Sequence, residues 1–388
     1  SQALTAPLTS GRGYSVYCPA RTYDFVGALR AGDIAVTGLT RTGNNGKSGW
    51  HLLGNPYPSP LNWDAVFFAD IPTGMSDAIA VWRPAVSGGS NGQYLTCANE
   101  AGTLPDGEVA MGQGFWVQVL NGAPAPLTFT FKDYMRIYDG YTDPRFNRAA
   151  PGAAAVSATV PAAERPRVQL SLRAATPEAE ATETVVYFQD GATAARDAHH
   201  DGAHPEHNVG LPTLLTLTPE GDELSINGQP LAALATGTTL PLLLDVPAPG
   251  SYELAPTALA NLSGTAVALV DRLTGTRYDL AATPRVAFRA EQAGEIRSRF
   301  ALEFGARVLG TSSLAPATSH FTLWPNPATE TVRLSGTAAG QTVQVLDATG
   351  RVVRRTTAAD VTTFDLRGLT PGVYVVRVGE QSQRLVVR

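Results

Sequence analysis

Residues 368–388 read GLTPGVYVVRVGEQSQRLVVR, and this stretch decides the fold class. A Thr-Pro-Gly turn precedes an alternating run in which Tyr374, Val376 and Val378 share one face. A second turn, GEQS, then leads into another short apolar run. Alternation with a period of two between turn residues is typical of paired β-strands with one buried face. We therefore expect a β-hairpin here.

The same pattern recurs along the chain. It is seen in RVQLSLR (167–173), DELSIN (222–227) and RFALEF (299–304), with turn signals such as PEGDE (219–223) and DRLTGT (271–276) between such runs. Gly and Pro together make up 66 of 388 residues, which interrupts the chain too often for long helices. The sequence predicts an all-β protein of consecutive β-sandwich domains, the last a small immunoglobulin-like sandwich.

Shifts in composition suggest the domain boundaries. Two stretches rich in small residues and lacking an apolar rhythm are expected to be linkers, at 148–165 and 306–319. They separate three segments: a β-sandwich-like module at 1–147, a second β-sandwich module at 166–305, and a last domain at 320–388.

Charge and hydropathy exclude several classes of protein. The chain has 29 Lys and Arg against 34 Asp and Glu, a net charge of −5, which argues against a nucleic-acid binder. No apolar run approaches the roughly 18 residues that would span a bilayer, so we expect no transmembrane segment. Residues 1–7 have neither the basic start nor the apolar centre of a signal peptide and include no Met, so we expect a piece of a longer protein.

Four stretches of the last segment carry a family resemblance. They are LWPNPAT (323–329), VQVLDATGRVV (343–353), FDLRGLTPGVYVVRV (364–378) and RLVVR (384–388). In this order they resemble the type A C-terminal sorting domain of the type IX secretion system of Bacteroidetes. The matching signal residues are Pro325, Asn326, Pro327, Asp347, Gly350, Arg351, Leu369, Pro371, Gly372 and Tyr374. Trp324 stands where Tyr is more usual, and Gly350 lies where the hairpin needs a left-handed backbone.

The resemblance implies a route and partners. Such proteins fold in the periplasm, pass the outer membrane through the translocon, are trimmed by a sortase, and are attached to surface lipopolysaccharide or released. We expect a secreted or cell-surface protein of a Gram-negative bacterium, with self-association as a further expectation. The stretch GWHLLGNPYPSPLNWD (49–64) is similar to β-modules found in other cargo proteins of this system.

Two cysteines, Cys18 and Cys97, lie in stretches expected to be strands of the first module. An oxidising compartment would allow a disulfide between them. The alternative is two separate buried thiols that fill space as small apolar groups.

The stretch GNPYPSPLNW (54–63) contains three X-Pro steps, which stiffen the backbone and project Tyr57 and Trp63. The two rings are expected either to form a platform on which a sugar or peptide stacks, or to plug the core of the sandwich.

The stretch RDAHHDGAHPEHN (196–208) concentrates four of the six histidines. Asp197, His199, His200 and Asp201 are candidate ligands for calcium or a transition metal. Because their spacing matches no zinc signature, a solvated loop that holds no cofactor is the alternative.

No nucleophile elbow, HExxH motif or phosphate-binding loop occurs in the sequence, so no catalytic residue is predicted. The expected function is that of a non-enzymatic, structural or adhesin-like surface protein. The alternatives are the accessory C-terminal part of a larger secreted enzyme, or a carbohydrate-binding module.

Overall fold

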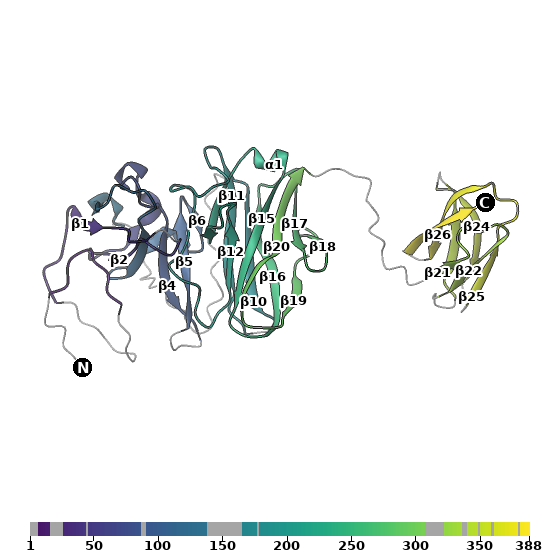
Figure 1. The fold of residues 1–388 in the computed structure, drawn as a ribbon, viewed down its shortest axis with the longest axis horizontal. Coiled ribbons are helices and arrows are strands. Elements are labelled where there is room, and N and C mark those ends of the chain that lie inside the picture. The colour runs from purple at the N-terminus through teal and green to yellow at the C-terminus, as the bar shows by residue number, and fades with distance from the viewer. Residues whose placement is uncertain are drawn as a thin grey trace. The chain divides into compact units, whose positions relative to one another are not determined.

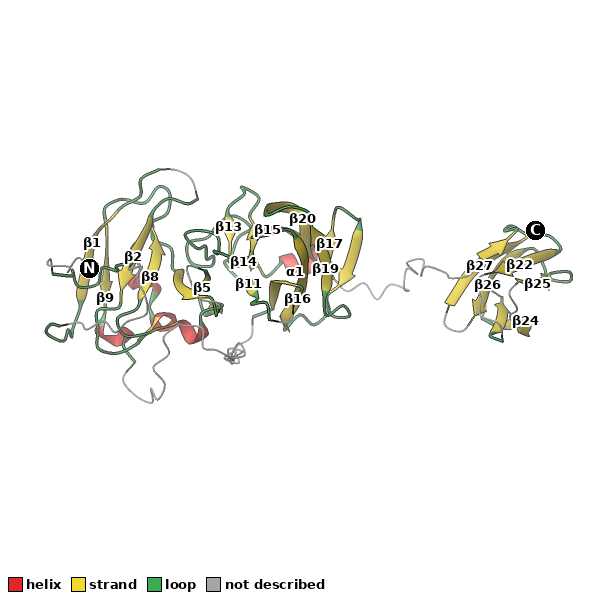
Figure 2. Cartoon of the chain, turned by 90° about the horizontal axis from the view of Figure 1, so that it is seen from below, coloured by secondary structure: helices red, strands yellow, loops and turns green. Residues whose placement is uncertain are grey.

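The computed structural model describes residues 7–15, 26–43, 46–86, 91–137, 165–176, 178–306, 322–335, 340–347, 350–357, 361–378 and 381–388. It divides into two compact units, Ser1–Arg307 and Val308–Arg388. Strands dominate both units, and the helical segments are single short turns (Figures 1 and 2). None of the helices in these ranges has the length and apolar character that crossing a bilayer requires. The prediction of an all-β fold is confirmed.

The first part of unit 1 is built on a five-stranded sheet with the order β2-β8-β4-β5-β6 and two strand pairs, β1-β9 and β3-β7. The strands are β1 (Ile34–Leu39), β2 (Trp50–Gly54), β3 (Leu61–Asn62), β4 (Ile79–Pro84), β5 (Gly92–Ala98), β6 (Ala101–Gly102), β7 (Glu108–Val109), β8 (Gly114–Gln118) and β9 (Leu127–Phe131). Short 3-10 turns lie at η1 (Trp63–Ala65), η2 (Phe68–Asp70), η3 (Pro105–Gly107) and η4 (Asp133–Met135). Its core combines aliphatic side chains with buried aromatic rings, among them Phe115, Phe129 and Phe131.

The second part of unit 1 is a sandwich of two sheets, ordered β14-β11-β10-β16-β19 and β13-β12-β15-β20-β17-β18. Its strands are β10 (Arg167–Ala174), β11 (Thr182–Gln189), β12 (Thr213–Leu217), β13 (Glu223–Leu224), β14 (Ile226–Pro230), β15 (Thr238–Val246), β16 (Gly250–Ala260), β17 (Thr265–Asp271), β18 (Thr276–Asp279), β19 (Val286–Ala290) and β20 (Gly294–Ala306). The helix α1 (Ala233–Thr236) is a single turn. Pairing is antiparallel apart from β11 with β14, which run parallel.

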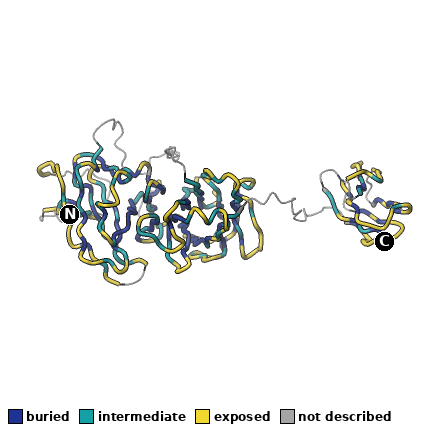
Figure 3. Tube along the Cα trace, turned by 90° about the horizontal axis from the view of Figure 1, so that it is seen from above, coloured by how far each residue is buried: buried dark blue, intermediate teal, exposed yellow. Residues whose placement is uncertain are grey.

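Alternation along these strands is what builds the second core. Val168, Leu170 and Leu172 on β10 are fully buried, and so are Phe300 and Leu302 on β20. Figure 3 shows the buried residues following the strands, while turns are exposed. The faces predicted from the sequence for these two strands are therefore confirmed.

The two parts of unit 1 share a small core of their own. Ala78, Ala98 and Ala101 from the first part pack against Val185, Tyr187 and Ile226 from the second. A β-bridge joins Gly92 to Val209, and the Asp77 amide donates to the Ala198 carbonyl. The predicted linker at 148–165 lies outside the described residues apart from Arg165, so that boundary stays a prediction.

Unit 2 is a sandwich of a three-stranded sheet, β21-β22-β25, and a four-stranded sheet, β24-β23-β26-β27. The strands are β21 (Thr322–Trp324), β22 (Thr331–Ser335), β23 (Thr342–Leu346), β24 (Val352–Thr357), β25 (Val361–Asp365), β26 (Gly372–Val378) and β27 (Gln381–Val387). Tyr374, Val376 and Val378 are buried between the sheets, as the opening stretch predicts. The expected hairpin is β26 paired with β27.

Candidate functional site

The Pro-Asn-Pro stretch of unit 2 holds the last strand. The Asn326 side-chain amide donates to the Arg384 carbonyl at 2.7 Å, and its carbonyl oxygen accepts from the Val386 amide at 2.9 Å. Ala328 continues the contact as a parallel bridge to Val387. The side chain of Asn326 therefore takes the place of a neighbouring strand, and β27 is held on both of its edges.

The other signal residues form turns. The Gly350 amide donates to the Asp347 carbonyl, and the carboxylate of Asp347 accepts from the Arg351 amide and guanidinium at 3.1 Å. Gly350 has a φ of 83°, so the predicted left-handed position is confirmed. Leu369 packs against the core, while Pro371 and Gly372 are exposed. The Tyr374 hydroxyl donates to the Thr370 carbonyl at 2.7 Å and so fixes the turn before β26.

The histidine-rich stretch lies between β11 and β12 and contacts both parts of unit 1. The Nδ1 atom of His199 lies 2.8 Å from Asp77 in the first part. The Nδ1 atom of His200 lies 3.2 Å from the Asn99 amide and 3.4 Å from the Tyr187 hydroxyl. Burial lowers the pKa of His200. These two histidines therefore serve as contacts between segments distant in the chain.

Asp201 is almost completely buried, at 1% exposure. Its carboxylate accepts from the Gly228 amide at 2.8 Å and from the Asp197 amide at 2.7 Å. Burial raises its pKa to about 7, against the effect of the two amide donors. At Gly228 a side chain would meet His200 at 2.7 Å, so only glycine lets the stretch approach β14 this closely.

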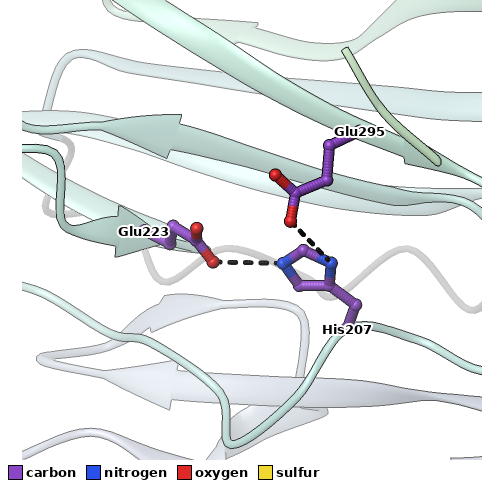
Figure 4. A group of neighbouring side chains, drawn as sticks. All are labelled: His207, Glu223 and Glu295. Atoms are coloured by element: carbon purple, nitrogen blue, oxygen red, sulfur yellow. Dashed lines mark hydrogen bonds and ion pairs between the residues drawn. The ribbon is translucent and has the colours of Figure 1, made fainter. Parts of the chain in front are cut away.

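A group that the sequence did not predict surrounds His207 (Figure 4). Its Nε2 lies 3.1 Å from Glu223 of β13, and its Nδ1 lies 2.9 Å from Asp245 of β15 and 3.9 Å from Glu295 of β20. Arg297 pairs with both Glu223 and Glu295. Although burial raises the pKa of Glu223, its bonds to Arg297 and His207 hold that pKa below the usual value.

The metal site predicted at Asp197, His199, His200 and Asp201 stays a prediction, and the structure gives these residues structural partners. Within the described ranges, the group of three or more side chains with metal-ligand spacing is His207, Glu223 and Glu295, and it contains none of Asp197, His199, His200 and Asp201. Those four contact separate structural partners, because the stretch is folded against two sheets. In the His207 group, Arg297 already supplies positive charge, so the arrangement is that of an ion-paired network that fastens the stretch to the sheet.

The two predicted aromatic residues are core residues. Tyr57 is 1% exposed and its hydroxyl donates to the Phe131 carbonyl at 3.1 Å. Trp63 is 5% exposed, and its indole N–H donates to the Asp77 carbonyl at 2.6 Å. The structure thus supports the core alternative over an exposed platform. The Pro-rich stretch at 54–63 has a stiff backbone that continues into β3 and η1, and both rings point into the core.

Cys97 is buried and forms no disulfide with another described residue, and its Sγ lies 3.0 Å from Asp64 Oδ1, to which the thiol donates. Burial, with the neighbouring Asp64 carboxylate, raises its pKa, so it is a poor nucleophile. Cys18 lies outside the described residues, and its disulfide with Cys97 stays a prediction.

Two family models match the chain. One, described as a domain of unknown function (DUF8693), matches residues 3–304, and the other, described as a secretion system C-terminal sorting domain, matches residues 322–388. The chain belongs to the DUF8693 family. Its last domain is a sorting domain, so this DUF8693 protein is a cargo of the type IX secretion system, exported to the cell surface or the medium of a Bacteroidetes bacterium.

Comparisons with curated proteins and with solved structures do not assign a role to this chain. No curated protein matches this DUF8693 chain. Among solved structures it is similar to PorZ of Porphyromonas gingivalis, described as an essential bacterial surface component of the type IX secretion system, at 25% identity. The match covers 22% of this chain and 14% of that chain, with a TM-score of 0.17, which is too low to bear on fold or role.

Proposed function

We propose that this protein is a non-enzymatic, adhesin-like component of the bacterial surface. The sorting domain supplies export, and unit 1 supplies a rigid β-body that remains outside the cell. Attachment to surface lipopolysaccharide after trimming by the sortase, and contact between copies of the chain, belong to the same proposal.

The contacts of the titratable groups of unit 1 support this role. Unit 1 contains carboxylate–imidazole pairs of the kind that general acid–base catalysis uses, namely His199 with Asp77 and His207 with Glu223 and Asp245. Each pair joins two segments that are distant in the chain, and Cys97 is buried and protonated. A role in stiffening the body accounts for these contacts without a reaction.

The proposal is tested in two ways. The purified full chain is screened against chromogenic glycoside, ester, peptide and phosphate substrates, and we expect no turnover above that of the buffer. In the host, deletion of the gene should reduce attachment of cells to surfaces or to each other, and the intact gene should restore it. Turnover that disappears in a His199→Gln variant would contradict the proposal and favour an enzyme.

A carbohydrate-binding module remains the second candidate, because Trp63 lines a pocket that also contains carboxylates. A glycan array probed with the full chain separates the two: binding to a defined glycan, lost in a Phe68→Ala variant with unchanged unfolding, would favour the module.

A further inference from the structure

A pocket of about 270 Å³ opens in the first part of unit 1, where η1 and η2 face the turn between β5 and β6. Six of its lining residues matter here: Trp63, Asp64, Phe67, Phe68, Asp77 and Glu100. The volume suits a single side chain or a ring of similar size rather than a large cofactor.

The rim of the pocket is aromatic and faces solvent. Phe67 is 66% exposed and Phe68 is 53% exposed, although Phe is among the residues that usually lie inside. The Phe68 ring lies 5.4 Å from that of His199, and the Phe67 ring lies 5.0 Å from that of Tyr134. Two ordered aromatic faces are thus presented beside the opening.

The wall of the pocket is acidic. The Asp77 side chain is 5% exposed; its Oδ2 contacts His199, and its Oδ1 has no hydrogen-bond partner among the described residues. The Oδ1 of Asp64 accepts from the Cys97 thiol and the Glu100 amide. Burial raises the pKa of both Asp64 and Asp77. No Lys or Arg lines the pocket in the described part of the chain, and Arg165 reaches Glu100 from beside it at 3.9 Å.

We infer that this pocket binds a cationic nitrogen group, the ammonium or guanidinium of a Lys or Arg side chain presented by a partner protein. Desolvated carboxylates gain most from a positive charge that also donates hydrogen bonds, and Asp64, Asp77 and Glu100 all line this pocket. The exposed rings of Phe67 and Phe68 supply faces that attract a cation. A neutral sugar would use the rings but would bring no positive charge to the acidic wall.

This inference rests on the proposed function for its setting, since it names the partner chemistry of a surface protein. The inference and the proposed function can fail independently of each other, because the binding test uses purified protein and does not depend on attachment of cells.

The test titrates the full chain with Nα-acetyl-lysine N-methylamide and with Nα-acetyl-arginine N-methylamide. The uncharged control is Nα-acetyl-norleucine N-methylamide, which has the four-carbon side chain of Lys without the ammonium group. The reporter is the NMR signal of the Trp63 indole N–H, which donates to Asp77 at the pocket. We expect saturable shifts with at least one basic probe and none with norleucine.

Variants localise the effect. Asp77→Asn keeps the shape of the side chain and should weaken binding by about tenfold, since one charged hydrogen bond is worth about that factor. Phe68→Ala removes an exposed ring and should also weaken it, which keeps the test decisive if Asp77→Asn fails to fold. Leu273→Ala, an exposed apolar residue in the turn between β17 and β18, should leave binding unchanged.

Three results would overturn the inference. They are no shift with either basic probe, equal shifts with norleucine, and a shift with a neutral sugar such as N-acetylglucosamine in place of the basic probes. The last result would assign the pocket to a carbohydrate.

Discussion

The sorting domain and unit 1 are both β-sandwich structures, yet they are held together differently. Between the sheets of the sorting domain the core is apolar, and Thr362 is its one buried polar residue among those described. Unit 1 buries Asp77, Asp201, Asn227 and Gln229 along with its apolar cores. The sorting domain has a polar link between distant segments, from Asn326 to β27, and it is exposed. Unit 1 joins distant segments through several polar contacts, and some of these are buried, such as that of Asp201 with Gly228.

The largest effect is expected from Phe300→Ala. Phe300 is fully buried and packs 4.9 Å from the Phe288 ring, so its removal leaves a cavity in the second core. Unit 1 should lose about 3–5 kcal/mol of its free energy of unfolding. Urea unfolding followed by two probes should show a lower midpoint for unit 1 and an unchanged one for the sorting domain. Leu273→Ala, at 73% exposure, is the control, and a shared shift of both midpoints would contradict the separation of the units.

The next largest effect is expected from Asp201→Ala, which tests the polar contacts of unit 1. The variant leaves the buried amide of Gly228 and that of Asp197 without their acceptor. We expect unit 1 to lose about 2–4 kcal/mol, because each unpaired buried donor is costly. Glu220→Ala, an exposed carboxylate nearby in sequence, should change the same measurement little. A loss no greater than that of the control would mean that the polar contacts do not hold the unit.

The pH dependence of the stability of unit 1 also tests the role of the buried Asp201. The folded pKa of Asp201, at about 7, lies above its usual value of 3.8, so the folded state binds this proton more tightly. The resulting stability is complete below about pH 4 and lost as pH rises through about pH 7. The free energy of unfolding of the wild type, measured relative to Asp201→Asn, should therefore fall over this range by about 3–4 kcal/mol. A constant or rising difference would show that burial does not control this carboxyl group.

Asn326→Ala tests the sorting domain. It removes both hydrogen bonds to β27, and these are exposed to solvent, so the domain should lose about 1–2 kcal/mol while unit 1 is unaffected. Trp324→Ala, at the end of β21, is the control, since that side chain is 68% exposed. Secretion of the variant in the host should fall along with its stability. Normal unfolding of the Asn326 variant would show that the Asn326 side chain does not contribute to holding β27.

The smallest effect is expected from Tyr374→Phe, which removes the contacts of the hydroxyl with the carbonyl and the side chain of Thr370 and keeps the buried ring. We expect the sorting domain to lose about 1 kcal/mol. Val373→Ala, an exposed residue next to it, is the control. Equal unfolding midpoints for the Phe variant and the wild type would assign the role of Tyr374 to packing alone.

Part of the structure follows from the sequence alone. The alternation of residues 374–378 placed their buried face, and the turn at Gly350 needed a left-handed backbone because of its position between two strands. Both features depend on neighbours within a few residues, so local chemistry decides them. The histidine-rich stretch was visible as a composition signal, but the structural partners of its histidines, such as Asp77 for His199 and Asn99 for His200, lie far away in the chain and could not be predicted.

The amino-acid sequence by itself determined the strand content, the buried faces and the sorting domain, because these follow from periodicity, turn residues and short ordered motifs. Only the tertiary structure decided that His207 meets Glu223 and Glu295, and that Trp63, Asp77 and Glu100 line one pocket. Those residues come from segments that strand pairing brings together, and strand pairing between distant segments leaves no local mark in the order of residues.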